Sequence, residues 1–114
     1  MKILVIDDDK DMRELLKIII EEKTEHKVLI AKNGLEGIEI LKKNPVDLVI
    51  TDRKMPQMLG EEVVRYVKLN YPHIKVILMS SVVDDVVALA AKDAGADLVV
   101  QKGNLVNTVE KFLD

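Results

Sequence analysis

The sequence predicts an α/β domain built on a doubly wound, five-stranded parallel sheet. Short apolar runs rich in Val, Ile and Leu recur five times, and each is followed by a segment with apolar residues at helical spacing. The 114 residues contain no linker or low-complexity segment. We therefore expect one domain over residues 1–114, long enough to bury roughly two thirds of the surface that its unfolded chain exposes.

The five predicted strands are the apolar runs 3–6, 28–30, 48–50, 76–79 and 98–100. Helices between successive strands make the strands parallel, with right-handed crossovers that place helices on both faces of the sheet. Five strands suit the flavodoxin-like (βα)5 arrangement, in which the strand order is 2-1-3-4-5. In that order strands 1 and 3 are neighbours, and ligands bind beyond their carboxyl ends.

Each predicted helix follows its strand. The first has apolar residues at i, i+3, i+4 and i+7 and a pair with the form of a capping box: Met12, Leu15, Leu16 and Ile19, with Asp11 and Glu14. The second, after Asn33-Gly34, and the third carry Leu35, Ile38 and Leu41, and Val63, Val64 and Val67. The fourth runs from about residue 84 to a stop at Gly95, and the fifth from about residue 104 to 113.

The composition argues against several classes of function. Without cysteine the chain has no disulfides, thiolate metal ligands or catalytic thiols, which suits a reducing cytosol. The net charge of −3, with acids and bases interspersed, argues against nucleic-acid binding. No apolar run approaches the roughly 20 residues of a membrane span. We expect a soluble, cytoplasmic protein that binds neither nucleic acid nor membrane.

Acidic residues stand where two neighbouring predicted strands end. Asp7 and Asp8 follow the first strand, and Asp52 follows the third. A buried strand has no structural use for a charge at its tip, and carboxylates 4 to 6 Å apart repel by about 4 kcal/mol per close pair at an effective dielectric constant near 20. Mg²⁺ suits one or two carboxylates and leaves positions for water and phosphate oxygens. The sequence therefore predicts a Mg²⁺ site here.

Two other strand ends carry groups that suit a phosphoryl group. The fourth predicted strand ends on Ser80-Ser81, which offers a hydroxyl and a backbone amide. Lys102 stands just past the fifth strand and brings a compact positive charge for a phosphoryl oxygen. Either residue alone indicates nothing, and only their predicted positions beside the acids make them candidates.

Four segments, in their order and spacing, resemble the receiver domain of two-component response regulators, the CheY-like superfamily. They are VIDDDKDMR, LVITDRKMPQMLG, VILMSS and GADLVVQK, and they extend over nearly the whole chain. The resemblance implies a single-domain response regulator, a switch that catalyses only its own phosphorylation and dephosphorylation. Its implied partners are a sensor histidine kinase or phosphotransfer protein, and a downstream protein target bound through the fourth helix, fifth strand and fifth helix.

The resemblance also implies a role for each polar residue of the site. Asp52 would be the phosphoacceptor, Ser80 would bond the phosphoryl group, and Lys102 would pair with it. The implied Mg²⁺ ligands are Asp8 directly, Asp7 through water, Asp52, and the backbone carbonyl of Lys54.

Three positions depart from the family pattern. Val99 stands where receivers usually carry an aromatic residue coupled to the serine or threonine, so the usual switch is not implied. Gly103 replaces the proline that normally follows the lysine. Because a cis bond without proline costs about 2.5 to 4 kcal/mol, we expect a trans bond there. Leu59 replaces a common acid before the loop glycine, with little expected consequence.

Other interpretations of the acids are weaker. Asp7 and Asp8 as caps of the first helix are redundant with Asp9 and Asp11. A calcium loop fails because Met12 stands where glycine is required and Ile18 where the closing glutamate belongs. A haloacid dehalogenase-type enzyme also forms an aspartyl phosphate, but DDDKD lacks the threonine of its D-x-D-x-T pattern.

Two questions stay open at this point. The chain could be an interaction module that acts independently of phosphorylation, or the receiver part of a larger transcriptional regulator. The fourth helix is too apolar all round for a plain exposed helix, so its valines could form core or a docking surface. The residues concerned are Val82, Val83, Val86, Val87, Leu89, Ala90 and Ala91.

Overall fold

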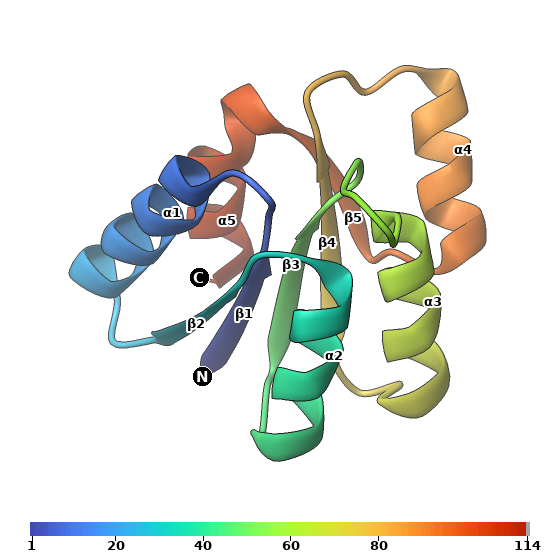
Figure 1. Cartoon of the computed structure of the whole chain (residues 1–114). Helices are drawn as coiled ribbons and strands as arrows, with labels where there is room; N and C mark the ends of the chain where they lie inside the picture. The colour runs from blue at the N-terminus through green and yellow to red at the C-terminus, as the bar shows by residue number, and fades with distance from the viewer. Residues whose placement is uncertain (114) are drawn as a thin grey trace.

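The computed structural model describes residues 1–113 and confirms the predicted fold class and strand order, β2-β1-β3-β4-β5 (Figure 1). All neighbouring strands are parallel. The strands are β1 (Lys2–Ile6), β2 (Lys27–Ala31), β3 (Leu48–Asp52), β4 (Lys75–Ser80) and β5 (Leu98–Gln101). The helices are α1 (Lys10–Lys23), α2 (Gly34–Lys43), α3 (Gly60–Asn70), α4 (Asp85–Ala94) and α5 (Leu105–Leu113), with a 3-10 turn (Lys102–Asn104) before α5.

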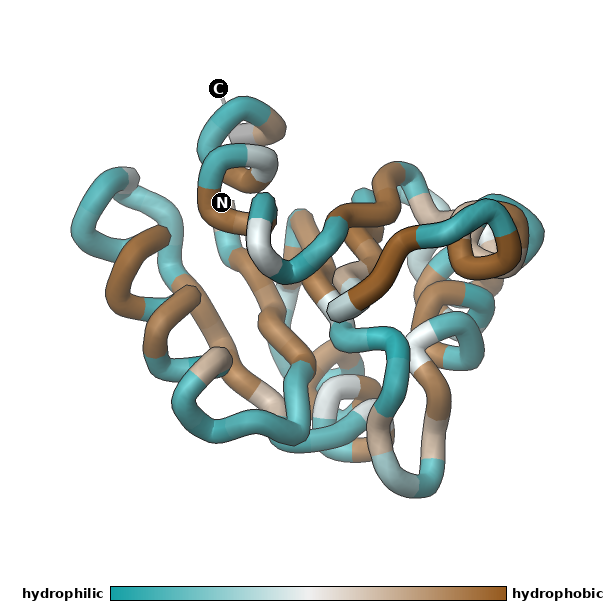
Figure 2. Tube along the Cα trace, turned by 90° about the horizontal axis from the view of Figure 1, so that it is seen from above, coloured by the Kyte–Doolittle hydropathy of each residue, from teal (hydrophilic) through white to brown (hydrophobic). Residues whose placement is uncertain are grey.

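Two helical layers cover the sheet. α1 and α5 pack on one face, and α2, α3 and α4 pack on the other (Figure 1). Along β1 the side chains alternate, so Ile3 and Val5 face α1 and α5 while Leu4 and Ile6 face the other layer. Figure 2 shows hydrophobic residues running along the strands between the layers. Each fully buried Leu, Ile or Val contributes about 1.5 to 3 kcal/mol.

The start of α1 differs from the sequence prediction. Its N-cap is Asp9, whose extended backbone lets its side chain accept a hydrogen bond from the Asp11 amide at 2.9 Å. The predicted Asp11–Glu14 capping box is therefore wrong, because Asp11 already lies inside the helix. The core-facing stripe is also rotated: Leu16 and Ile20 are buried, whereas Leu15 is 49% exposed.

The α3 helix begins against the end of β3. A β-carbon at Gly60 would lie 2.2 Å from the carbonyl oxygen of Asp52, so only glycine permits this approach. Leu59 is the N-cap and has no side-chain acceptor, unlike Asp9, Asn33 and Asp84 at other helices. Glu62 accepts from the Leu59 amide at 3.3 Å, which supplies only one half of a capping box.

The α4 helix ends as predicted at Gly95, which has a left-handed backbone with φ of 100°. Val87 and Ala91 are buried, but Val82, Val86 and Leu89 are 60%, 72% and 61% exposed. A core role is therefore wrong for Val82 and Val86 and right for Val87. Among residues 1–113 no helix has the length and apolar character to cross a bilayer.

Candidate functional site

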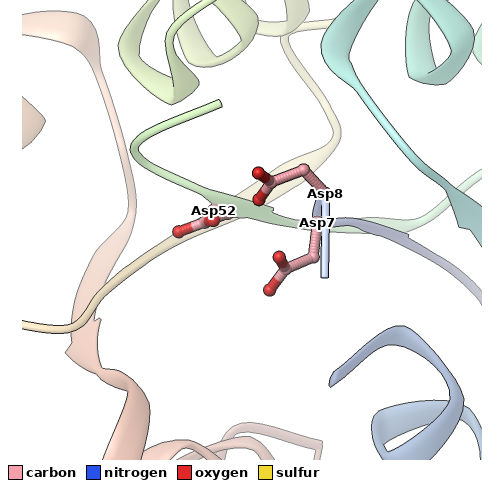
Figure 3. Close-up of side chains that lie close together, drawn as sticks. All are labelled: Asp7, Asp8 and Asp52. Atoms are coloured by element: carbon pink, nitrogen blue, oxygen red, sulfur yellow. The ribbon is translucent and has the colours of Figure 1, made fainter. Parts of the chain in front are cut away.

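Three acids meet beyond the carboxyl ends of β1 and β3. Ile6 is the register partner of Thr51, so the residues that follow, Asp7 and Asp52, emerge side by side. The carboxylates of Asp7, Asp8 and Asp52 each offer an oxygen, and these oxygens lie within 4.8 Å of one another (Figure 3). Asp7 and Asp52 are buried, whereas Asp8 is exposed. The structure therefore brings together the three acids that the sequence singled out.

Within the part of the chain that the structure describes, only one of the two carboxylate oxygens of Asp7 accepts a hydrogen bond. Its Oδ1 accepts from the Asp9 amide at 2.9 Å, and its carbonyl accepts from Nη1 of Arg13 at 2.8 Å. Its buried Oδ2 has no hydrogen-bond donor among the described residues. The nearest positive charge is Nζ of Lys102 at 3.3 Å, an ion pair without hydrogen-bond alignment. Oδ2 of Asp7 is therefore free to coordinate a cation.

Lys102 reaches into the acids from the end of β5. Its Nζ lies 3.2 Å from Oδ2 of Asp52, and its side chain is 23% exposed. Burial alone would lower the pKa of Lys102, but the charges of Asp52 and Asp7 outweigh burial and raise it. The expected trans bond at Gly103 is confirmed, since residues 1–113 contain no cis peptide. Lys102 is aimed at the acids without the usual proline.

Asp52 carries an uncompensated charge. Burial, and then the negative charge of Asp7, raise the pKa of Asp52 from 3.8 to about 6, against the opposing effects of Lys102 and of the Arg53 amide. That amide donates to Oδ1 of Asp52 at 2.9 Å. One lysine therefore does not neutralise this cluster. Together with the orphaned oxygen of Asp7, this makes the donor set suitable for a hard divalent cation.

Ser80 and Lys54 complete the predicted set. Ser80 is buried at the end of β4 and follows Met79, the register partner of Asp52. Its Oγ accepts a hydrogen bond from the Val82 amide at 3.4 Å. Lys54 lies two residues past Asp52, and its side chain is exposed, with no ion pair among residues 1–113. In the same loop the Met58 amide donates to the Pro56 carbonyl at 2.8 Å across Gln57, whose φ is 73°.

Three residues at the site were missed in the sequence. Arg13 fixes the backbone of Asp7, and Arg53 forms an ion pair with Glu61 at 3.1 Å. Arg13 lies in the first turn of α1, four residues after the N-cap Asp9, and this spacing signals proximity to the end of β1. No local signal joins Arg53 to Glu61, because they lie on opposite sides of the β3–α3 loop.

Comparison with known families decides what this site belongs to. The model of the response regulator receiver domain matches residues 3–113, nearly the whole chain. The chain belongs to that family. The four sequence segments that suggested the resemblance all lie within the matched range, and the acids at the ends of β1 and β3 are part of it.

Curated relatives of this receiver domain differ in length. Sporulation initiation phosphotransferase F of Bacillus subtilis is 34% identical over 95 residues, which cover 83% of this chain and 76% of that protein. A protein-glutamate methylesterase/protein-glutamine glutaminase of Pyrococcus horikoshii is 37% identical over 86 residues, which cover 75% of this chain. The chain spans only 23% of that enzyme's length.

Solved structures share the fold. The response regulator TrrA of Thermotoga maritima, whose structure is a complex with Mg²⁺ and BeF, has a TM-score of 0.83 and 32% identity, with 96% of each chain covered. This similarity covers nearly the whole chain, so the fold and the family agree.

Proposed function

We propose that this receiver domain is a Mg²⁺-dependent phosphoryl switch in which Asp52 accepts a phosphoryl group from a sensor histidine kinase or phosphotransfer protein. One observation carries the proposal. Asp52 is a buried carboxylate whose pKa is raised to about 6 beside a second acid, with one lysine in contact. Near pH 7 it is still mostly ionised, as a nucleophile must be, and it lies at the end of the sheet where ligands bind.

The residues of the site divide the work of phosphoryl transfer. An oxygen of Asp52 forms the new bond to phosphorus while the bond from phosphorus to the donor breaks. Lys102, already 3.2 Å from Asp52, pairs with the phosphoryl oxygens, and the hydroxyl of Ser80 donates a hydrogen bond to them. Asp7, Asp8, Asp52 and the carbonyl of Lys54 would hold Mg²⁺, which when bound neutralises the acids and draws charge from the phosphoryl oxygens.

The signal would leave through α4, β5 and α5 to a downstream protein in the cytoplasm. The exposed side chains of Val86 and Leu89 on α4 support a protein contact there, because apolar groups gain by burial. Val99 is half-buried and offers no aromatic ring to rotate. The proposal applies both to a single-domain regulator and to the receiver of a larger one.

Phosphorylation is tested by intact mass after incubation with acetyl phosphate and Mg²⁺. The parent should gain one phosphoryl group, and Asp52→Asn and Asp52→Ala should gain none. Lys102→Ala and Asp8→Ala should react more slowly, because each removes a contact to the reacting group or to the cation. Label on Ser80 or on a histidine contradicts the assignment of Asp52. An unmodified parent favours the alternative, an interaction module that acts without phosphate.

A further inference from the structure

An ion pair joins the residue after Asp52 to the first turn of α3. Nε of Arg53 lies 3.1 Å from Oε2 of Glu61, and the two side chains are only 20% and 8% exposed. Arg53 opens the β3–α3 loop, and Glu61 is the second residue of the helix that closes it. The pair therefore spans the base of the loop that carries Lys54.

A contribution to folding stability does not explain why Arg53 and Glu61 form a buried ion pair. Oε1 of Glu61 is buried and has no hydrogen-bond partner among residues 1–113, so the carboxylate is half satisfied. The desolvation of a buried ion pair commonly cancels its Coulomb attraction, and apolar residues of similar volume are often as stable or more so. The unpaired oxygen of Glu61 adds a further desolvation cost, so this ion pair should contribute little or nothing to stability.

The geometry around Arg53 suggests a different role. Its carbonyl accepts from the Gly60 amide at 2.7 Å, and its amide faces both the Met79 carbonyl and Oδ1 of Asp52 at 2.9 Å. A β-carbon at Gly60 would lie 2.8 Å from Cα of Arg53. The backbone of Arg53 is thus fixed on both sides, and the ion pair also fixes its side chain. Lys54, whose carbonyl is a proposed metal ligand, is the next residue.

We propose that Arg53 and Glu61 are a positioning pair for the cation site: they hold the β3–α3 loop so that the Lys54 carbonyl and Asp52 face the same ion. The inference rests on the proposed Mg²⁺ site. Partners that orient metal ligands typically change metal affinity by about ten- to a hundredfold when removed. We expect the Mg²⁺ Kd to rise about tenfold without the pair.

The test replaces the whole pair with apolar residues, Arg53→Met with Glu61→Leu. This double variant keeps the net charge, so it does not change the attraction of the protein for cations through its total charge. It leaves neither partner buried and unpaired, so it should unfold near the parent Tm. The matched control is Lys42→Met with Glu39→Leu, which removes the exposed α2 ion pair at 3.4 Å.

Isothermal titration with Mg²⁺ alone is the main measurement, and amide hydrogen exchange of residues 53–55 in the metal-free protein is the second. The double variant should bind Mg²⁺ about tenfold more weakly and exchange faster in the loop at an unchanged Tm, while the control behaves like the parent. A role in stability only would instead lower Tm and leave Kd unchanged. Arg53→Lys keeps a cation opposite Glu61 and should recover most of the affinity.

A parent-like Kd in the double variant overturns the inference. If the double variant does not fold, the reversed apolar pair, Arg53→Leu with Glu61→Met, which also keeps the net charge and leaves neither partner unpaired, takes its place with the same criterion. A parent that binds no Mg²⁺ at millimolar concentration overturns the proposed metal site itself, which distinguishes the two failures.

Discussion

Lysine–aspartate clusters lie at both ends of the sheet, and they behave in opposite ways. At the amino end, Nζ of Lys68 lies 2.5 Å from Oδ2 of Asp97, which also accepts from the Val76 amide at 2.8 Å. At the carboxyl end, Lys102 lies 3.2 to 3.3 Å from Asp52 and Asp7. The pKa of Asp97 is lowered, whereas the pKa of Asp52 is raised to about 6.

The difference comes from what surrounds each carboxylate. Burial alone would raise both pKa values. At Asp97 the hydrogen bonds from Lys68 and Val76 and the charges of Lys68 and Lys75 outweigh burial. At Asp52 the second acid, Asp7, adds to burial, and one lysine cannot offset both. At the amino end, the hydrogen bonds of Asp97 join α3 and β4 to the residue before β5, and the carboxylate is fully compensated. At the carboxyl end, one lysine supplies too little positive charge for the acids.

The largest expected effect is a gain in stability, whereas most substitutions at buried positions lower the free energy of unfolding. Asp52→Asn should stabilise the metal-free protein at pH 8 by up to about 3 kcal/mol, from 1.4 kcal/mol per unit of pKa difference. Urea unfolding in chelator measures it. Asp93→Asn on α4 makes the same charge change at an exposed acid and should do little. An Asp52→Asn protein no more stable than the parent would mean that Lys102 already compensates the cluster.

This gain should depend on pH. The folded pKa of Asp52, about 6, lies above its unfolded value near 3.8, so the folded state binds the extra proton between these values. The contribution of Asp52 to the stability of the parent therefore falls as pH rises from about 4 to 6, and the advantage of Asp52→Asn grows over the same window. A pH-independent difference between the two proteins would contradict this origin.

At the amino end the same substitution should have the opposite effect. Asp97→Asn weakens a charge-assisted hydrogen bond and should destabilise the protein by about 1.5 kcal/mol at pH 7, measured by urea unfolding. Because the folded pKa of Asp97 lies below its unfolded value, this contribution exists above the unfolded pKa and disappears as pH falls through the folded one. Equal signs for Asp97→Asn and Asp52→Asn would abolish the comparison.

The smallest expected effect concerns how long the carboxyl end keeps a phosphoryl group. Hydrolysis needs a water aligned opposite the Asp52 oxygen, and in receivers the residues two beyond the phosphoacceptor and two beyond the hydroxyl govern its access. With Asp52 as the proposed phosphoacceptor and Ser80 as the proposed hydroxyl, these are Lys54 and Val82, both exposed. Val82 offers water no hydrogen bond, and the stem of Lys54 can cover the approach. We therefore expect slow self-dephosphorylation.

Lys54→Asn with Val82→Glu should shorten the lifetime at least about threefold, because both new side chains can hold a water. Decay of the phosphorylated species in Mg²⁺, followed by intact mass or Phos-tag gel, measures it. If parent and double variant decay equally fast, Lys54 and Val82 do not shield the phosphoryl group from water, and a partner phosphatase or the Lys102-Gly103 turn sets the timing.

Much of this architecture was predictable because it follows from short-range patterns. The apolar runs fixed the strands, and parallel strands necessarily place Asp7, Asp8 and Asp52 at one edge. The predictions that were wrong required a choice between residues that fit the same local pattern equally well. Asp9 and Asp11 can both cap a helix, and only the chain's exit from β1 selects Asp9.

Contacts between residues far apart in the chain could not be predicted from local sequence patterns. Leu15 fits a helical stripe as well as Leu16 does, yet only Leu16 faces the sheet. Glu61 looks like an ordinary acid in the first turn of a helix. Its burial against Arg53 follows from the close approach of Gly60 to β3, which no local pattern encodes.

A thermal melt with millimolar Mg²⁺ and with chelator decides whether the carboxyl end has too little positive charge for its acids while the amino end is compensated. Mg²⁺ at ten times its Kd should stabilise the parent by about 1.4 kcal/mol, a Tm shift of several degrees. Asp97→Asn should keep this shift, and Asp8→Ala and Asp52→Asn should lose most of it. Identical midpoints for the parent in Mg²⁺ and chelator, or an undiminished shift in Asp52→Asn, would mean that the acids at the carboxyl end need no added cation.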